Sequence, residues 1–407
     1  MNVIEILRQR GFLEQMTHED ELVKLLDKPG VRFYNGYDPT ADSLHIGHLL
    51  NFMAVSWMQK CGHIPIILLG GGTGMIGDPD KPDDMRPLLD IAEIDYNISR
   101  FAEQAARFID FADGRAILIN NGDWLRHLNY ADFIRTYGVH FSVNRMLSAD
   151  KYKTKFEGSG LNFFELNYMV MQAYDFLELS RSQNCFLQTG GSDQWSNIIA
   201  GVELIRRADK KQAYGMTFSL LARPDGQKMG KSLGGAIWLD AQKTSPYDFF
   251  QHFRNIPDSA VHEHLARLTF LPMEQVEELS AASGAALNAS KEILAFEVTK
   301  IVHGEDEAQK ALIAAKTVFA GGSQGAPETQ MPPARFENPM PFLDLMKEID
   351  LIPSLSEGRR LITQGGVSVN GEKITDTNHA VALADFADGE IMIKKGKKVF
   401  HKIVLKG

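Results

Sequence analysis

Apolar segments of strand length alternate with helical patterns over the first 207 residues of the chain. Residues 64–69 and 116–120 are almost wholly apolar, as strands buried on both faces of a parallel sheet are. Residues 91–111, 163–179 and 192–207 place their apolar side chains at helical spacing. This order predicts an α/β fold with a Rossmann-like, doubly wound parallel sheet and ligands at the carboxyl ends of its strands.

The first strand and helix of this pattern enclose a possible anion site. Residues 31–36 are rich in aromatic and β-branched side chains, and helical spacing begins at residue 44. His45 and His48 therefore fall in the first turn of a helix, whose dipole and backbone N–H groups favour an anion. Gly47 between them lets a phosphate or a flat ring approach. The pattern indicates a nucleoside triphosphate site, and two unrelated surface histidines are the alternative.

Two further loops suit phosphate groups. The glycine-rich segment 70–79 directly follows a predicted strand and allows close approach of a ligand to the backbone. Lys228 and Lys231 lie three residues apart in the glycine-bearing loop 224–232. Two lysines at this spacing suit a clamp on a polyphosphate, although such a loop alone is usually a solvated turn.

Composition narrows the class of protein. The chain has 407 residues, of which 44% are hydrophobic, so two or three domains with their own cores are expected. Cys61 and Cys185 are too few for a disulfide framework or a four-cysteine metal site, so we expect a reducing cytoplasm and no dedicated metal site. The opening residues lack a basic-then-apolar leader, and the apolar run at 64–69 is far too short to span a membrane.

Changes in pattern along the chain predict four segments. Residues 1–245 form the α/β domain, and residues 246–320 carry helical patterns without strand signals. Residues 321–340 are rich in Gly, Pro, Ser and Gln and indicate a linker. Residues 341–407 predict a small α+β module with ten Lys and Arg against nine Asp and Glu, which makes it less acidic than the rest of a chain of net charge −9.

The His-Ile-Gly-His and Lys-Met-Gly-Lys-Ser segments together resemble the HIGH and KMSKS motifs of the class I aminoacyl-tRNA synthetases. Glycine replaces the first serine of the second motif, and both lysines are kept. Over nearly its whole length the chain resembles the bacterial tyrosyl-tRNA synthetases, and the matching pieces are residues 34–48, 71–79, 141–144, 168–175, 188–195 and the lysine loop. The resemblance implies a tyrosine–tRNA ligase that uses ATP with its accompanying Mg²⁺, has tRNA(Tyr) as partner and forms a homodimer, with residues 130–147 as the candidate interface.

Three polar residues of the predicted helix 163–179 point to a binding site for a small zwitterion. Tyr168, Gln172 and Asp175 are spaced i, i+4 and i+7, so they share one face of an otherwise apolar helix. The resemblance implies that Asp175 and Tyr34 bind the phenolic hydroxyl and that Tyr168, Gln172 and Asp78 hold the ammonium group. The full tyrosine-binding set that it implies is Tyr34, Asp78, Tyr168, Gln172, Asp175, Gln188 and Gln194.

The resemblance also implies the residues that handle ATP. An acid at a strand-to-helix turn, such as Asp193, can accept a ribose hydroxyl or cap the helix, and Ser192 is an equal candidate for the cap. The implied ATP-binding residues are Gly36, Asp38, Gly47, His48, Gly191, Asp193 and Lys231. The implied catalytic residues, on the leaving pyrophosphate and the reacting phosphate, are Thr40, His45, His48, Lys81, Arg86, Lys228 and Lys231.

The last module resembles an RNA-binding module first seen in the fourth protein of the small ribosomal subunit. Its implied tRNA-binding residues are Arg359, Arg360, Lys394, Lys395, Lys397 and Lys398, with Lys402 in the same basic cluster. Basic side chains of this kind bind phosphates, although a lysine-rich edge strand is the alternative.

Three other functions stay open at this point: a tryptophanyl-tRNA synthetase, a synthetase-like RNA-binding protein without activity, and a small adenylyltransferase. Tyr34 with Asp175 favours a phenol over an indole, and the retained histidines and lysines favour an enzyme. The helical segment and the RNA-binding module argue against a small adenylyltransferase.

Overall fold

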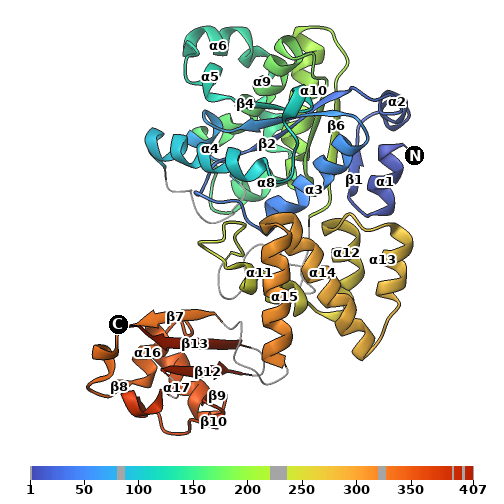
Figure 1. The fold of residues 1–407 in the computed structure, drawn as a ribbon. Helices are drawn as coiled ribbons and strands as arrows, with labels where there is room; N and C mark the ends of the chain where they lie inside the picture. Colours follow the sequence, from blue (N-terminus) through green and yellow to red (C-terminus); the bar gives the residue numbers. More distant parts are fainter. Residues whose placement is uncertain are drawn as a thin grey trace. The chain divides into compact units, whose positions relative to one another are not determined.

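The computed structural model describes residues 2–79, 88–220, 236–319, 327–386, 389–396 and 399–406 (Figure 1). The chain divides into two compact units. The first unit comprises Met1–Ser245 and Phe253–His303, and the second comprises Pro246–His252 and Gly304–Gly407. Within the described residues, no helix combines the length and the apolar character needed to cross a membrane.

A six-stranded sheet forms the centre of the first unit, with strand order β1-β6-β5-β2-β3-β4. Five neighbouring strands are parallel, and the edge strand β1 pairs antiparallel with β6. This confirms the predicted doubly wound parallel sheet, to which the structure adds β1 and β6, two strands that the sequence pattern did not reveal. The strands are β1 Leu13–Met16, β2 Arg32–Tyr37, β3 Ile64–Leu69, β4 Ile117–Asn120, β5 Leu187–Gly191 and β6 Tyr214–Phe218.

Helices cover both faces of this sheet (Figure 1). The connections β2–α3–β3 and β5–α10–β6 run in opposite directions across the sheet. Because such parallel crossovers are right-handed, α3 and α10 lie on opposite faces. The helices between α1 and α10 are α1 Val3–Gln9, α2 Glu19–Leu25, α3 Ile46–Lys60, α4 Ile91–Ala105, α5 Gly122–Leu125, α6 Tyr130–Thr136, α7 Val143–Leu147, α8 Asp150–Glu157, α9 Phe163–Ser182 and α10 Trp195–Ala208, with 3-10 turns η1 Thr73–Met75, η2 Ala112–Gly114, η3 Gly138–His140 and η4 Ser192–Gln194.

The order of the strands reverses between β2 and β5, which lie side by side although about 150 residues separate them. On one side of this point the chain proceeds to β3 and β4, and on the other side to β6. Crossover helices therefore leave β2 and β5 toward opposite faces and open a crevice at the carboxyl ends of the two strands. The sheet thus determines where a ligand can bind.

The first unit also contains a group of helices after the sheet, with bounds η5 Asp258–Ala260, α12 Val261–Leu268, α13 Met273–Ser280 and α14 Ala285–His303. Arg10, just after α1, joins them to the sheet. Its guanidinium donates to the carbonyl oxygens of Ala266 at 2.8 Å and Leu271 at 2.6 Å and lies 4.0 Å from the ring centroid of Trp57 on α3. Three contacts by this one buried side chain hold the end of α12 against α3.

The second unit contains a five-stranded sheet of order β10-β9-β12-β13-β7 and a two-stranded sheet of β11 and β8. Its elements are α15 Glu305–Phe319, β7 Glu328–Met331, η6 Pro333–Phe336, β8 Met340–Pro341, α16 Phe342–Glu348, α17 Leu355–Thr363, β9 Val367–Val369, β10 Glu372–Lys373, β11 Ala380–Val381, η7 Leu383–Asp385, β12 Glu390–Lys395 and β13 Val399–Leu405, and α11 Pro246–Arg254 begins in this unit. Buried side chains of α16, α17 and the larger sheet share one core, as expected for an α+β module.

Part of the segment predicted as a linker, 321–340, is structured. Strand β7 pairs in parallel with β13 from Glu328↔Lys402 to Met331↔Leu405. The composition of this segment is that of a linker, and its few strand residues give no local strand signal. They form a strand because they pair with β13, which lies far away in the sequence. The division of the chain into domains at residues 245, 320 and 340 stays a prediction.

Candidate active site

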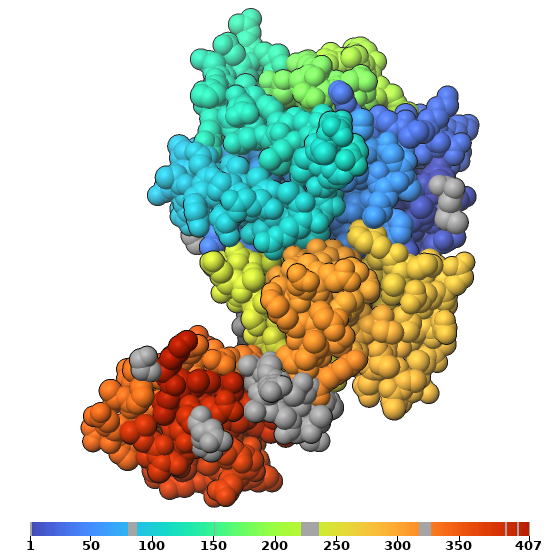
Figure 2. Space-filling model, viewed as in Figure 1, coloured from blue at the N-terminus to red at the C-terminus, as the bar shows by residue number. Residues whose placement is uncertain are grey.

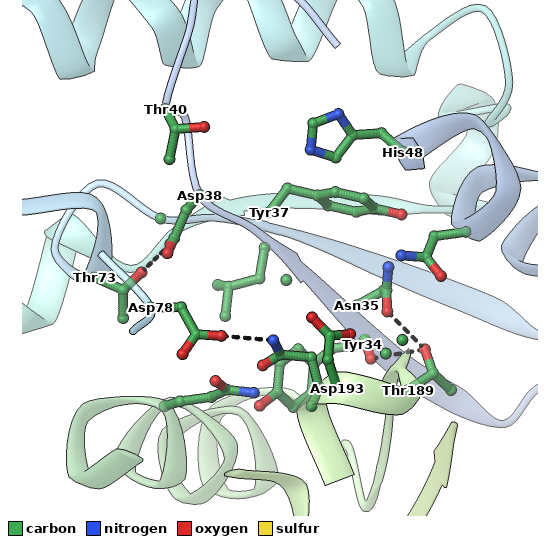
Figure 3. Close-up of a pocket in the computed structure, with 18 of the residues that line it drawn as sticks. Tyr34, Asn35, Tyr37, Asp38, Thr40, His48, Thr73, Asp78, Thr189 and Asp193 are labelled. Atoms are coloured by element: carbon green, nitrogen blue, oxygen red, sulfur yellow. Dashed lines mark hydrogen bonds between the residues drawn. The ribbon is translucent and has the colours of Figure 1, made fainter. Parts of the chain in front are cut away.

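A cavity of about 290 Å³ lies at the carboxyl ends of β2, β3 and β5, where the strand order reverses (Figure 3). The start of α3 and one face of α9 complete its wall. Most residues that the sequence analysis assigned to tyrosine and ATP meet here. These lining residues are Tyr34, Gly36, Asp38, Thr40, His45, Gly47, His48, Asp78, Tyr168, Gln172, Asp175, Gly191, Asp193 and Gln194.

At one end of the cavity lies the carboxylate of Asp175, which is 2% exposed. Asn121 donates to Oδ2 and the indole N–H of Trp124 donates to Oδ1, each at 2.8 Å. Burial raises the pKa of Asp175 to about 8, and the two hydrogen bonds act in the opposite direction. Because both oxygens face N–H donors, the two donors favour the carboxylate over the protonated acid.

Tyr34 of β2 belongs to the same apolar cluster as residues of α9, and its ring lies 5.3 Å from that of Phe176. Burial raises the pKa of Tyr34 well above its ordinary value, so its hydroxyl keeps its proton. This hydroxyl is buried and has no hydrogen-bond partner among the described residues. Buried polar groups normally have partners, so Tyr34 and Asp175 together suit a ligand that brings its own hydroxyl to this end of the cavity.

A second carboxylate, that of Asp78, lines the cavity near the end of α9 that carries Tyr168 and Gln172. Gln194 donates to its Oδ2 at 2.6 Å, as the dashed line in Figure 3 marks. Lys151 of α8 forms an ion pair with its Oδ1. The side chain of Asp78 is only 8% exposed, so the carboxylate and the Lys151 ammonium form a largely buried ion pair.

An amide network connects this carboxylate with α9. Asn197 donates to Gln172 Oε1 at 2.9 Å and to Gln194 Oε1 at 3.1 Å. The hydroxyl of the fully buried Tyr152 donates to Asn197 Oδ1 at 3.3 Å. Gln172 and Gln194 therefore hold defined rotamers before a ligand enters, which lowers the entropic cost of binding.

Asp38, just after β2, joins two other elements at the cavity wall. Its Oδ1 accepts from Thr73 at 2.7 Å and its Oδ2 accepts from the Tyr168 hydroxyl at 2.8 Å. Burial, and next the charge of Asp38, raise the pKa of Tyr168 well above its ordinary value. Asn121 in turn donates to Thr73 at 2.9 Å, so the network continues to Asp175.

The first turn of α3 differs from the anion site that the sequence suggested. His45 is the N-cap, and its Nδ1 accepts from the Gly47 N–H at 3.0 Å, while Nδ1 of His48 accepts from the His45 N–H at 3.1 Å. The N–H groups of Ile46 and His48 bond to the carbonyls of Ile237 and His45. The expectation of free backbone donors is therefore wrong at these four positions.

The two imidazoles lie against each other at this helix start. Their rings stack 3.9 Å apart between centroids. Since each Nδ1 accepts a backbone N–H, the proton of the neutral ring sits on Nε2. Both histidines line the cavity.

The glycines of this site have two different roles. Gly36 in β2 faces open space, since no heavy atom lies within 4 Å of the position that a Cβ would take. At Gly70 a Cβ would lie 2.1 Å from Asp38, and at Gly71 it would lie 2.1 Å from Asn120. The glycine-rich segment thus makes room for neighbouring side chains, whereas Gly36 leaves the cavity open to a ligand.

The turn after β5 places Gly191 and Asp193 at the cavity. Neither η4 nor α10 has a side-chain N-cap hydrogen bond, so the capping alternative for Asp193 and Ser192 finds no support here. Thr189 of β5 lines the cavity, whereas Gln188, which the resemblance assigned to tyrosine, does not. The side chain of Gln188 points instead toward Gly201 of α10.

Four of the predicted catalytic residues lie outside the described residues: Lys81, Arg86, Lys228 and Lys231. Their roles stay predictions. Within the parts of the chain that the structure describes, no group of three or more His, Cys, Asp and Glu side chains is arranged to hold a metal ion. Both cysteines are free thiols.

Sequence reasoning missed several side chains of the site. Asn121 and Thr73 follow β4 and β3, and their position after a strand end is the signal that would have indicated them. Asn35 and Asn51 are not among the predicted site residues, yet both line the cavity, and each has a buried amide atom without a partner among the described residues. Nothing in the local sequence indicated Lys151.

The predicted tRNA-binding residues of the second unit have different surroundings. Arg359 and Arg360 are exposed on α17, where Arg360 pairs with Glu357 at 2.7 Å. Lys394 lies 5.0 Å from the ring centroid of Phe400. Lys395 is half-buried and donates to the Leu351 carbonyl, and burial lowers its pKa. Lys397 and Lys398 lie outside the described residues.

Comparisons with known proteins agree with this geometry. The family model for tRNA synthetases class I (W and Y) matches residues 27–320, and that for the tyrosine–tRNA ligase SYY-like C-terminal domain matches residues 321–403. The chain is 52% identical over 408 aligned positions to a tyrosine–tRNA ligase of Clostridium botulinum, and 53% identical over 405 to one of Clostridium beijerinckii, with all of each chain covered. A truncated mitochondrial tyrosyl-tRNA synthetase of Aspergillus nidulans superposes with a TM-score of 0.70 at 28% identity, covering 78% of this chain and 94% of that one. The chain belongs to the class I tRNA synthetases of the tryptophan and tyrosine group.

Proposed function

We propose that the chain is a tyrosine–tRNA ligase, which activates L-tyrosine with ATP and transfers it to the 3′ end of tRNA(Tyr). Full-length relatives that are 52% and 53% identical carry the name tyrosine–tRNA ligase, which supports this assignment over a tryptophanyl-tRNA synthetase. It is also the activity that the cavity suits, with a site for a phenol at one end and stacked imidazoles at a helix start.

The observation that carries this proposal is the pair of Asp175 and Tyr34. A tyrosine hydroxyl can donate to the buried carboxylate and accept from the Tyr34 hydroxyl, which has no partner among the described residues. Phenylalanine would leave both groups without that partner, and buried polar groups left unpaired penalise a ligand heavily. The pair thus accounts for selection of tyrosine over phenylalanine.

In the first step the carboxylate of tyrosine attacks the α-phosphate of ATP, forming a P–O bond while pyrophosphate leaves. Asp78, Tyr168 and Gln172 hold the ammonium group, and Gln194 lies beside them near the attacking carboxylate. Asp193 and Gly191 hold the ribose. Catalysis needs no acid or base, since it rests on positioning and on donors to the growing phosphate charge.

The Nε2–H groups of His45 and His48 supply two of those donors, with Thr40 beside them. Lys228, Lys231, Lys81 and Arg86 supply positive charge for the leaving pyrophosphate. We treat Mg²⁺ as part of the substrate, bound to the phosphates of ATP. In the second step a ribose hydroxyl of the terminal tRNA nucleotide attacks the carbonyl carbon of tyrosyl-adenylate and releases AMP.

The basic side chains of the last module would bind tRNA phosphates. Arg359 and Arg360 are exposed on one helix, and Lys394 is partly exposed on β12. Lys395, Lys397 and Lys398 complete this proposed surface, although Lys395 would first have to leave the Leu351 carbonyl. Phosphate contacts of this kind position an RNA and weaken with salt.

We further propose that two copies of the chain associate through residues 130–147. Tyr130, Val139 and Val143 in this segment are 65%, 72% and 54% exposed, so one short segment leaves three large apolar side chains uncovered. The segment, which includes α6, lies at the outer surface of the first unit (Figure 2, teal, upper left). Sedimentation should show a dimer that Val139→Asp weakens. The ligase would work in the cytoplasm, where tRNA is charged.

Tyrosine-dependent exchange of pyrophosphate into ATP tests the proposed function. Tyrosine should support exchange, whereas tryptophan and phenylalanine should not. Asp175→Ala should abolish exchange while ATP binding survives, because the phenol site is lost and the nucleotide site remains. Exchange with tryptophan instead of tyrosine, or near-normal exchange in Asp175→Ala, would contradict the assignment.

A further inference from the structure

Lys151 is a charged residue that the proposed reaction does not use, although it reaches the proposed ammonium site. It lies in the first turn of α8, and its Nζ forms an ion pair with Oδ1 of Asp78. The two side chains are only 14% and 8% exposed. Gln194 occupies the other oxygen of the same carboxylate. Both oxygens of Asp78 are therefore engaged before any substrate arrives.

This arrangement conflicts with the role of Asp78 in the proposed function. There the carboxylate holds the ammonium group of tyrosine, which would place a second cation beside Lys151. Two like charges at one carboxylate repel each other, and little water screens them where both side chains are largely buried. An ammonium group can bind fully only if it weakens the contact between Lys151 and Asp78.

We propose that Lys151 is an internal counter-ion of Asp78 that competes with the ammonium group of tyrosine and thereby sets the affinity for tyrosine. The inference rests on the proposed function and adds Lys151 as a positioning residue of that site. In the empty site Lys151 neutralises a carboxylate that would be costly to bury unpaired. On binding, the ammonium group takes over this contact.

The anchoring of α8 limits the movement to the lysine side chain. Tyr152 is fully buried and bonds to Asn197. Lys155 pairs with Glu165 of α9 at 2.5 Å, and both of these side chains are buried. The helix itself is thus held within its first turn, at Tyr152, and again at Lys155. The long, flexible side chain of Lys151 can swing away from Asp78 without moving the backbone.

Binding measurements with three ligands separate competition from simple support of Asp78. Tyrosine and tyramine carry an ammonium group, and 3-(4-hydroxyphenyl)propionate has the same phenol without one. Removing the competing cation with Lys151→Met should tighten tyrosine and tyramine about three- to tenfold. The propionate should not bind more tightly. Lys153→Met, on the same helix but exposed, is the matched control and should change none of the three.

Thermal unfolding supplies a second readout. Without ligand, Lys151→Met should have a lower Tm than the wild type, because Asp78 loses its cation, and saturating tyrosine should raise the Tm more in the variant. Lys151→Gln, which keeps a neutral donor, should show the same changes to a smaller extent and serves if the methionine variant does not fold.

Weaker or unchanged binding of tyrosine and tyramine in both variants would overturn the inference, since Lys151 would then only support Asp78. Equal tightening of all three ligands would overturn it too, because the effect would not depend on the ammonium group. A wild-type chain that binds none of the ligands would overturn the proposed function together with this inference.

Discussion

Replacing Trp124 by phenylalanine removes one hydrogen bond from the buried carboxylate of Asp175 and keeps an aromatic ring in place. The indole N–H donates to Oδ1 at 2.8 Å, and Asn121 remains as the donor to Oδ2. A hydrogen bond to a charged group contributes about 1.5–3 kcal/mol, which is about 1–2 pKa units at 1.36 kcal/mol each. The pKa of Asp175, about 8 in the wild type, should therefore rise by that amount.

The rise has a defined effect on tyrosine binding. The phenolic hydroxyl donates to the ionised carboxylate, so the affinity falls as the pH drops below the pKa of Asp175. Raising the pKa of Asp175 moves this decrease in affinity toward higher pH. At pH 7, tyrosine should therefore bind about 10- to 100-fold more weakly to Trp124→Phe than to the wild type. Equilibrium binding of tyrosine between pH 6 and 9 measures both the affinity and the midpoint.

Two controls make the test specific. Phenylalanine has no hydroxyl, so its weaker binding should not decline further in Trp124→Phe. Trp57→Phe is the matched variant, because the buried indole nitrogen of Trp57 has no hydrogen-bond partner among the described residues and Trp57 does not line the cavity. It should leave tyrosine binding unchanged. An unshifted midpoint, or equal losses for tyrosine and phenylalanine in Trp124→Phe, would refute the reasoning.

Three further outcomes are expected. Lys231→Ala should slow formation of tyrosyl-adenylate about 10²–10³-fold in single-turnover experiments, the usual loss of a group that stabilises transition-state charge, and a loss confined to tyrosine affinity would contradict that role. Lys155→Met should lower the free energy of unfolding by about 3–5 kcal/mol in urea titrations, because Glu165 would be buried without its cation, and a change below about 1 kcal/mol would show that the pair is dispensable. A chain that ends at residue 319, before β7, should keep tyrosine-dependent pyrophosphate exchange but bind tRNA more weakly and with a shallower salt dependence, whereas full charging at physiological salt would contradict a tRNA-binding role for the tail.

The sequence predicted the sheet because its signals are local. The apolar run of β3 and the helical spacing of the apolar residues in α9 can be recognised from neighbouring residues alone. Each pattern indicates which side chains of the element are buried. Parallel strands bring their carboxyl ends to one edge, so residues placed after different strands could be expected to meet. Strands β1 and β6 were missed because their sequences, Leu-Glu-Gln-Met and Tyr-Gly-Met-Thr-Phe, contain no unbroken apolar run like that of β3.

The first turn of α3 shows where local reasoning fails. The positions of His45 and His48 at a helix start could be predicted from their spacing. Their use of Nδ1 to satisfy backbone N–H groups could not be predicted, since it depends on rotamers that the folded site selects. The glycine-rich segment was likewise identified as a close-approach loop, but only the folded structure shows that Asp38 and Asn120 pack against Gly70 and Gly71.

By itself, then, the sequence determined the fold class, the family resemblance and many of the described residues that line the cavity. Only the tertiary structure decided how those residues are connected: Asn121 reaches Asp175 across 54 positions of the chain, and Lys151 reaches Asp78 across 73. Helical and strand periodicity arise from interactions between near neighbours, and residue patterns record them. Hydrogen-bond partners and counter-ions of buried groups are chosen among side chains that only the completed fold brings within reach, so no local pattern can specify them.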